Sequence, residues 1–133
     1  MRFLIDTHVC LWAVAEKHKL SGRSREALED LKNEIYFSQV SLLEIAIKFQ
    51  TGKLANFNVS LPVFNDALLK MGFILLPIKN DHLYTYFSTN LFSENHRDPF
   101  DRYLLATAAY EHCGIITKDE KFQFYNNSVE IVW

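Results

Sequence analysis

The chain has 133 residues, of which 49% are hydrophobic and 23% charged, and this composition is that of a globular protein with its own core. We therefore expect a single domain that spans residues 1–133. The formal net charge is only -2, so the chain as a whole does not attract a polyanion. Binding to nucleic acid would require a local basic patch or metal ions. The longest apolar runs, 9–15 and 73–78, are far too short to cross a membrane.

The cysteines and the N-terminus indicate a compartment. Cys10 and Cys113 each stand among apolar neighbours, which is typical of small buried side chains rather than of a disulfide framework or a zinc site. Unpaired cysteines fit a reducing environment. Asp6 and His8 interrupt the first apolar run before the core of a signal peptide could form. These features predict a cytoplasmic protein.

Short apolar segments alternate with helical patterns along the chain. An apolar run that ends in a turn predicts a buried strand, and apolar residues at helical spacing predict a helix. In the helix predicted at 23–33, Ala27, Leu28 and Leu31 form one stripe. In chain order we expect a strand at 3–5, helices at 9–15 and 23–33, a strand at 35–37, helices at 41–49 and 60–71, a strand at 73–76, a helix at 80–91, a polar loop at 92–97, a helix from Pro99, and strands at 115–117 and 129–132.

Strands that alternate with helices predict parallel pairing through helical crossovers. We therefore expect a three-layer α/β/α domain with a central, mainly parallel sheet of four to five strands. Gly52, Gly72 and Gly114 each follow a helical pattern, where a left-handed residue commonly ends a helix.

Four carboxylates occupy positions that such a fold could bring together. Asp6 directly follows the first predicted strand, and Asp119 comes two residues after the end of the fourth. Glu44 and Asp101 belong to the expected first turns of two apolar helices. Ligands of open α/β sheets bind beyond the carboxyl ends of the strands, so the four acids could converge there.

Each of these acids also has a simpler explanation as a helix cap. Ser41 and Glu44 match a capping box, and Asp98 with Asp101 match an N-cap and the third residue of a helix. The other two acids also precede helical patterns. However, two of the helices look buried, and crowded carboxylates repel one another unless a cation neutralises them or their pKa values rise. Oxygen ligands without cysteine or histidine at zinc spacing favour Mg²⁺ or Mn²⁺, and such ions suit phosphodiester hydrolysis.

Several segments together resemble PIN-domain proteins and, more narrowly, the VapC toxins of bacterial and archaeal type II toxin–antitoxin modules. The resemblance runs in family order from residue 1 to about residue 120. The segments that carry it are FLIDTHV at 3–9, SLLE at 41–44, DPFDR at 98–102, ATA at 106–108 and ITKD at 116–119.

This resemblance implies an endoribonuclease that depends on Mg²⁺ or Mn²⁺. It implies a core acidic site of Asp6, Glu44 and Asp101, with Asp119 as a fourth, more variable member and all four as metal ligands. We expect the additional acid Asp98 to act as an N-cap that supports the site rather than as a direct ligand. Three hydroxyl residues beside the acids could orient a carboxylate or a water, or could be ordinary cap and turn residues: Thr7, Ser41 and Thr117.

The resemblance also implies partners. These are an RNA substrate, a cognate antitoxin that docks on apolar surface, and a second copy in a homodimer. Metal-assisted hydrolysis needs no histidine base, so we expect His8 and His96 to pack or to lie at the surface. The candidates for phosphate contacts, which could instead be solvated surface charges, are Arg97, Arg102, Lys118, Lys48 and Lys121.

Three other readings remain open on the residues alone. A receiver-type signalling domain would need an aspartate at the end of the third strand, but 73–78 ends without one. A phosphatase of the haloacid dehalogenase type would need a second aspartate where His8 stands. A PIN-like domain without catalytic activity would only bind partners, and the presence of all four acids argues against it.

Overall fold

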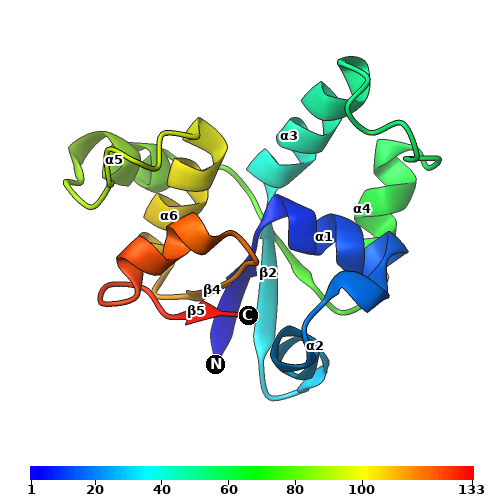
Figure 1. Cartoon of the computed structure of the whole chain (residues 1–133), viewed down its shortest axis with the longest axis horizontal. Coiled ribbons are helices and arrows are strands. Elements are labelled where there is room, and N and C mark those ends of the chain that lie inside the picture. Colours follow the sequence, from blue (N-terminus) through cyan, green and yellow to red (C-terminus); the bar gives the residue numbers. More distant parts are fainter.

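A sheet of five parallel strands forms the middle layer of the computed structural model, which describes residues 1–133 (Figure 1). The strands lie in the order β3-β2-β1-β4-β5, and every neighbouring pair is parallel. The expected three-layer α/β/α fold is therefore confirmed, with five strands and no antiparallel pair. The strands are β1 (Arg2–Ile5), β2 (Glu34–Ser38), β3 (Ile74–Leu76), β4 (Gly114–Ile116) and β5 (Ile131–Val132).

Helices cover both faces of this sheet. In Figure 1, α5 and α6 lie on one side of the sheet and α1 and α4 on the other. No helix is both long and apolar enough to cross a bilayer. The helices are α1 (Thr7–Ala15), α2 (Gly22–Glu29), α3 (Gln39–Gln50), α4 (Leu61–Lys70), α5 (Asn80–Ser88) and α6 (Pro99–Glu111), with short 3-10 helices η1 (Lys17–Lys19) and η2 (Glu120–Tyr125).

The central strand β1 divides its side chains between two apolar cores. Phe3 and Ile5 pack with buried residues of α1, α3 and α4, whereas Leu4 packs with buried residues of α6 and η2. This division follows from the alternation of side chains along a strand. Cys10 and Cys113 are unpaired and buried, one in each core, as expected for small apolar side chains.

The strand order places a switch point beside β1. The chain first builds outward through β2 and β3 on one side of β1, and it then returns to add β4 and β5 on the other side. The crossovers therefore diverge at the junction of β1 and β4, where α/β sheets open a crevice at the carboxyl ends of the strands.

Two helices end earlier than expected because polar side chains form turns there. The helix predicted at 23–33 ends at Glu29, since the carboxylate of Asp30 accepts a hydrogen bond from the N–H of Lys32. Leu31 consequently leaves the predicted apolar stripe and is fully exposed. The helix predicted at 80–91 ends at Ser88, where the hydroxyl of Thr89 starts a similar turn.

The prediction of left-handed glycines after three helices is confirmed at two positions and wrong at the third. Gly52 and Gly72 have positive φ angles of 74° and 86° after α3 and α4. After α6, His112 takes this conformation instead, with φ 56°. Gly114 belongs to β4, where a Cβ atom would lie 2.9 Å from the ring of Phe3. Gly114 therefore permits close packing between strands and does not cap the helix.

Candidate active site

The most buried of the predicted acids lies at the switch point between β1 and β4. Asp6 directly follows β1, and only 5% of the residue is exposed. Its carboxylate accepts hydrogen bonds from the backbone N–H of Val9, at 2.8 Å, and from the hydroxyl of Thr117, at 2.5 Å. Because Thr117 directly follows β4, this second bond joins the ends of two neighbouring strands. Asp6 thus caps α1, as the simpler explanation held, and also lies at the edge of the sheet.

The surroundings of Asp6 favour a proton or a cation. Burial raises the pKa of its carboxyl group from 3.8 to about 6. The hydrogen bonds from Thr117 and Val9 lower this pKa, because they stabilise the charged form, whereas the carboxylates of Asp119 and Glu44 raise it. The influence of Asp119 and Glu44 on this pKa indicates that segments far apart in the sequence lie close together here.

Glu44 reaches the same region from α3 and is also buried, with 8% exposed. One carboxylate oxygen accepts the hydroxyl proton of Thr7 at 2.7 Å, and the other forms an ion pair with Lys48 at 2.9 Å. The hydroxyl of Ser41 lies 3.0 Å from that of Thr7. Thr7 therefore links α1 to α3 and positions Glu44 beside Asp6.

The capping box of Ser41 and Glu44, the simpler explanation for this acid, is not formed. Helix α3 begins at Gln39, and its N-cap is Ser38, whose hydroxyl accepts a hydrogen bond from the N–H of Val40. Glu44 consequently lies in the second turn of the helix and not in the first. Its carboxylate does not cap the helix and instead contacts the side chains of Thr7 and Lys48.

Asp101 enters the site from the first turn of α6. Its N–H donates to the carboxylate of Asp98 at 3.0 Å, so Asp98 is the N-cap of the helix, as expected. One oxygen of Asp101 lies 3.0 Å from Nε2 of His96. Burial raises the pKa of Asp101 to about 6, the bond to His96 opposes this shift, and the charges of Asp98 and Asp119 add to it.

His96 is a member of this site that the sequence reasoning missed. Packing was expected for it, and its fully buried ring does lie 4.9 Å from that of Phe122. However, its second nitrogen, Nδ1, lies 3.1 Å from the hydroxyl of Tyr125, whose oxygen also accepts the N–H of Ser93. His96 therefore connects Asp101 to the opposite segment η2. No local pattern signals this connection, because its partners lie 5 and 29 residues away.

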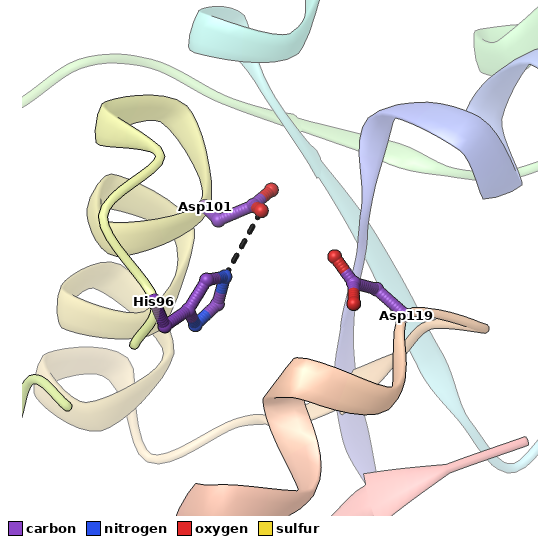
Figure 2. Close-up of side chains that lie close together, drawn as sticks. All are labelled: His96, Asp101 and Asp119. Carbon is purple, nitrogen blue, oxygen red and sulfur yellow. Dashed lines mark hydrogen bonds and ion pairs between the residues drawn. The ribbon is translucent and has the colours of Figure 1, made fainter. Parts of the chain in front are cut away.

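Asp119 faces Asp101 across the site, as Figure 2 shows. Ligand atoms of His96, Asp101 and Asp119 all lie within 4.8 Å of one another. The N–H of Asp119 donates to the hydroxyl of Thr117, and its carboxylate accepts the N–H of Lys121, which makes it the cap of η2. Asp119 therefore caps η2, as the simpler explanation held, and also lies close to the carboxylate of Asp101.

The donor atoms at this edge of the sheet suit a hard divalent cation. Carboxylate oxygens are the preferred ligands of Mg²⁺ and Mn²⁺, and Asp101 and Asp119 approach within the span of one coordination sphere. Burial is the main cause of the raised pKa values of Asp6 and Asp101, and the negative charge of neighbouring acids adds to it. A cation at this position would offset that repulsion, and the residues present therefore fit a divalent metal.

The basic side chains near the acids differ in what they contact. Lys48 pairs with Glu44, and Arg97 donates from Nε to the carbonyl of Glu94. The guanidinium of Arg102 donates to the carbonyls of His96 and Ser93, at 2.6 and 3.1 Å, and so stabilises the 92–97 loop. The ammonium of Lys118 lies 5.9 Å from the centre of the Trp12 ring, and Lys121 is exposed.

Comparison with known proteins agrees with this architecture. A family model described as PIN domain matches residues 3–126. No curated protein sequence matches the chain. Among solved structures, VapBC2 from Rickettsia felis bound to a DNA fragment of its promoter is similar, with 18% identity, a TM-score of 0.69 and complete coverage of both chains. A toxin–antitoxin complex from Klebsiella pneumoniae has 15% identity and a TM-score of 0.59, with 98% of this chain and 95% of the other covered. VapBC-5 from Mycobacterium tuberculosis has 14% identity and a TM-score of 0.56, with 98% and 94% covered.

Proposed function

The chain belongs to the PIN domain family, and from this membership we propose that it is a metal-dependent endoribonuclease toxin of the VapC type. The observation that supports the proposal is the approach of Asp101 and Asp119 within 4.8 Å of each other and of His96, at the edge of the sheet where Asp6 and Glu44 are also buried. Solved structures with the same fold are described as toxin–antitoxin complexes, which supports a cognate antitoxin. We propose Mg²⁺ or Mn²⁺ as the cofactor and these metal ligands: Asp6, Glu44, Asp101 and Asp119.

The metal would activate a water molecule and stabilise the leaving oxygen of a phosphodiester. The chain holds its acids ready for this role. Thr117 fixes one oxygen of Asp6, Thr7 fixes one oxygen of Glu44, and His96 fixes one oxygen of Asp101. Side chains restrained in this way lose little conformational freedom when they bind an ion. Lys48 neutralises Glu44 and would be displaced or shared when a cation binds.

Substrate binding must overcome the negative charge of the acids. We propose that cations at the rim contact the phosphates of the RNA, with Arg97 and Lys118 as the principal candidates. Arg102 was predicted for the same role, but two of its N–H groups already donate to loop carbonyls. Its contribution to RNA binding would therefore be limited to the rest of the guanidinium. A homodimer and a cytoplasmic location are further predictions from the sequence.

A cleavage assay tests the proposed function. The purified protein, free of antitoxin, would be incubated with total cellular RNA in Mn²⁺ or Mg²⁺, and the new RNA ends mapped by sequencing. We expect discrete cuts that EDTA and the substitution Asp101→Asn abolish. Asp66→Asn is the matched control, since Asp66 is an exposed acid on α4. Cleavage by Asp101→Asn at the rate of the unmodified protein would refute the site, and absence of any metal-dependent cut would refute the function.

A further inference from the structure

A pocket beside the candidate active site has no role in metal binding. Its volume is about 280 Å³, and it lies between α1 and the loop that joins α3 to α4. We call it the α1 pocket. Its wall includes His8, Leu11, Trp12, Lys53, Asn56 and Phe57.

The α1 pocket adjoins the acids through His8. This residue follows Asp6 by two positions and contributes its ring to the pocket wall. Trp12 of the same wall lies 5.9 Å from the ammonium of Lys118, which directly precedes Asp119. The pocket therefore borders the acidic site at two places. A polymer whose reacting phosphate lies at the acids would place a neighbouring unit at this pocket.

Flat rings form one part of the pocket wall. The centroid of the His8 ring lies 5.7 Å from that of Trp12, and Trp12 lies 5.7 Å from Trp133. Phe57 contributes a further ring from the loop. Aromatic surfaces of this kind stack on nucleobases with little dependence on sequence. His8 therefore adds a planar ring beside that of Trp12 in the pocket wall.

Cations lie in the wall and at its edge. Lys53 lines the pocket and makes no ion pair. Lys118 is not part of the wall, but its ammonium lies 5.9 Å from the centre of the Trp12 ring, and it makes no ion pair either. Lys19 also lines the pocket, but Glu16 neutralises it at 2.8 Å. One uncompensated positive charge therefore lies in the pocket wall, and a second lies beside Trp12 on the residue that directly precedes Asp119. This combination matches a base and its phosphate.

A second pocket nearby differs from the α1 pocket in the side chains that line it. It has a volume of about 270 Å³, lies between α3 and the start of α4, and contains Ile45, Phe49, Val59 and Leu61. No charged side chain lines it, so it suits an apolar segment of a protein. The α1 pocket differs from it in its lysines and in its nearness to the acids.

We propose that the α1 pocket binds one nucleotide of the single-stranded RNA substrate, next to the nucleotide whose phosphate is cleaved. The base lies against His8 and Trp12, and its phosphate lies near Lys53 and Lys118. This subsite rests on the proposed ribonuclease function. It extends that function by locating where the strand is held outside the acidic centre.

Binding measured without cleavage tests the subsite. The Asp101→Asn protein in Mg²⁺ would be titrated with a fluorescein-labelled, mixed-sequence oligoribonucleotide of about 12 residues, a length that covers typical single-strand sites. Anisotropy gives the Kd, and tryptophan emission reports contact with Trp12 and Trp133. We expect the RNA to quench this emission and inorganic polyphosphate, which has no bases, to leave it unchanged.

Substitutions in the Asp101→Asn protein distinguish binding in the pocket from general attraction between RNA and positive charge. We expect His8→Ala and Lys53→Ala each to raise the Kd about five-fold or more, the size expected for the loss of one stacked base or one phosphate contact. His18→Ala and Lys70→Ala are exposed controls of the same residue types and should change the Kd less than two-fold. Circular dichroism would verify that each variant is folded.

The outcomes distinguish the subsite from the function. Unchanged RNA affinity in both pocket variants, while the unmodified protein still cleaves RNA, would overturn the subsite and leave the nuclease intact. If the unmodified protein neither binds nor cleaves RNA, both proposals fail. Equal quenching by RNA and polyphosphate would overturn the stacked base, because a phosphate chain alone would then account for the signal.

Discussion

At the scale of single residues, two carboxyl groups of the site bind protons more tightly than free carboxyl groups do. Burial raises the pKa of Asp6 and of Asp101 to about 6, from 3.8. The folded protein therefore takes up these protons more readily than the unfolded chain. The resulting stabilisation is complete below about pH 4 and is lost as the pH rises through about 6. Without metal, the two acids make the protein less stable at neutral pH than at pH 4.

The substitution Asp6→Asn should remove part of this pH dependence. The amide has nearly the shape of the carboxyl group but does not titrate between pH 4 and pH 8. In EDTA, we expect the free energy of unfolding of the variant, relative to the unmodified protein, to rise from pH 4 to pH 7. Urea denaturation at several pH values measures it, and the difference cancels the contributions of titrating groups that do not interact with Asp6. A difference that stays constant over this range would show that Asp6 ionises like an ordinary carboxyl group.

His96 is fixed by a chain of hydrogen bonds with one consistent direction. The N–H of Ser93 donates to the oxygen of Tyr125, so the Tyr125 hydroxyl can donate to Nδ1 of His96. Nε2 of His96 can then donate to Asp101, at 3.0 Å. This arrangement gives both ring nitrogens of His96 a partner and fixes one oxygen of Asp101.

Loss of this orientation should weaken metal binding. We expect His96→Asn to lower Mn²⁺ affinity by about 10- to 100-fold, as is usual for residues that orient a ligand. His96→Gln should restore part of the affinity, because its longer side chain can bring an N–H to the place of Nε2. Calorimetric titration with Mn²⁺ measures both variants, and His18→Ala serves as an exposed control. Equal losses in the Asn and Gln variants would indicate that His96 only fills space.

At the scale of helices and strands, periodic segments were predictable and their junctions were not. The apolar pattern located all five strands, and the cap of α6 followed from Asp98 and the proline after it. The start of α3 was missed because strand and helix adjoin without a loop. Ser38 pairs with Leu76 as the last residue of β2 and is also the N-cap of α3. A residue with both roles leaves no polar gap in the sequence, so Ser41 looked like the cap.

Substitution of the two serines should separate these roles. Ser38→Ala removes the acceptor for the N–H of Val40 and should cost about 1 kcal/mol of stability. It should also speed hydrogen exchange of the amides in the first turn of α3. Ser41→Ala leaves the cap in place, so exchange in that turn should match the unmodified protein. Faster exchange in Ser41→Ala but not in Ser38→Ala would restore the capping box that the structure excludes.

At the scale of the whole molecule, the candidate site depends on sheet order more than on any single motif. Asp6 and Thr117 are 111 residues apart and touch only because β4 returns to the free side of β1. The sequence indicated the acids through their positions after strands and through a family resemblance. It could not indicate the contact of His96 with Tyr125 or that of Thr7 with Glu44, which arise from tertiary packing. The α1 pocket was unforeseen for the same reason, since its wall joins α1 to a distant loop.

A site assembled from four distant segments should couple metal binding to folding. The unfolded chain cannot bring these acids together, so a cation binds almost only the folded state, and at 100 times its Kd it adds about 2.7 kcal/mol to stability. We therefore expect Mn²⁺ to raise the Tm of the unmodified protein at pH 7.5. Asp101→Asn should have the higher Tm in EDTA, because it removes a charge that is partly buried and is repelled by Asp98 and Asp119, yet it should gain much less from Mn²⁺. Asp66→Asn should respond to the ion as the unmodified protein does. If Mn²⁺ raised the Tm of all three proteins equally, the ion would bind elsewhere. Protonation alone would then have to relieve the repulsion between the carboxyl groups of the site.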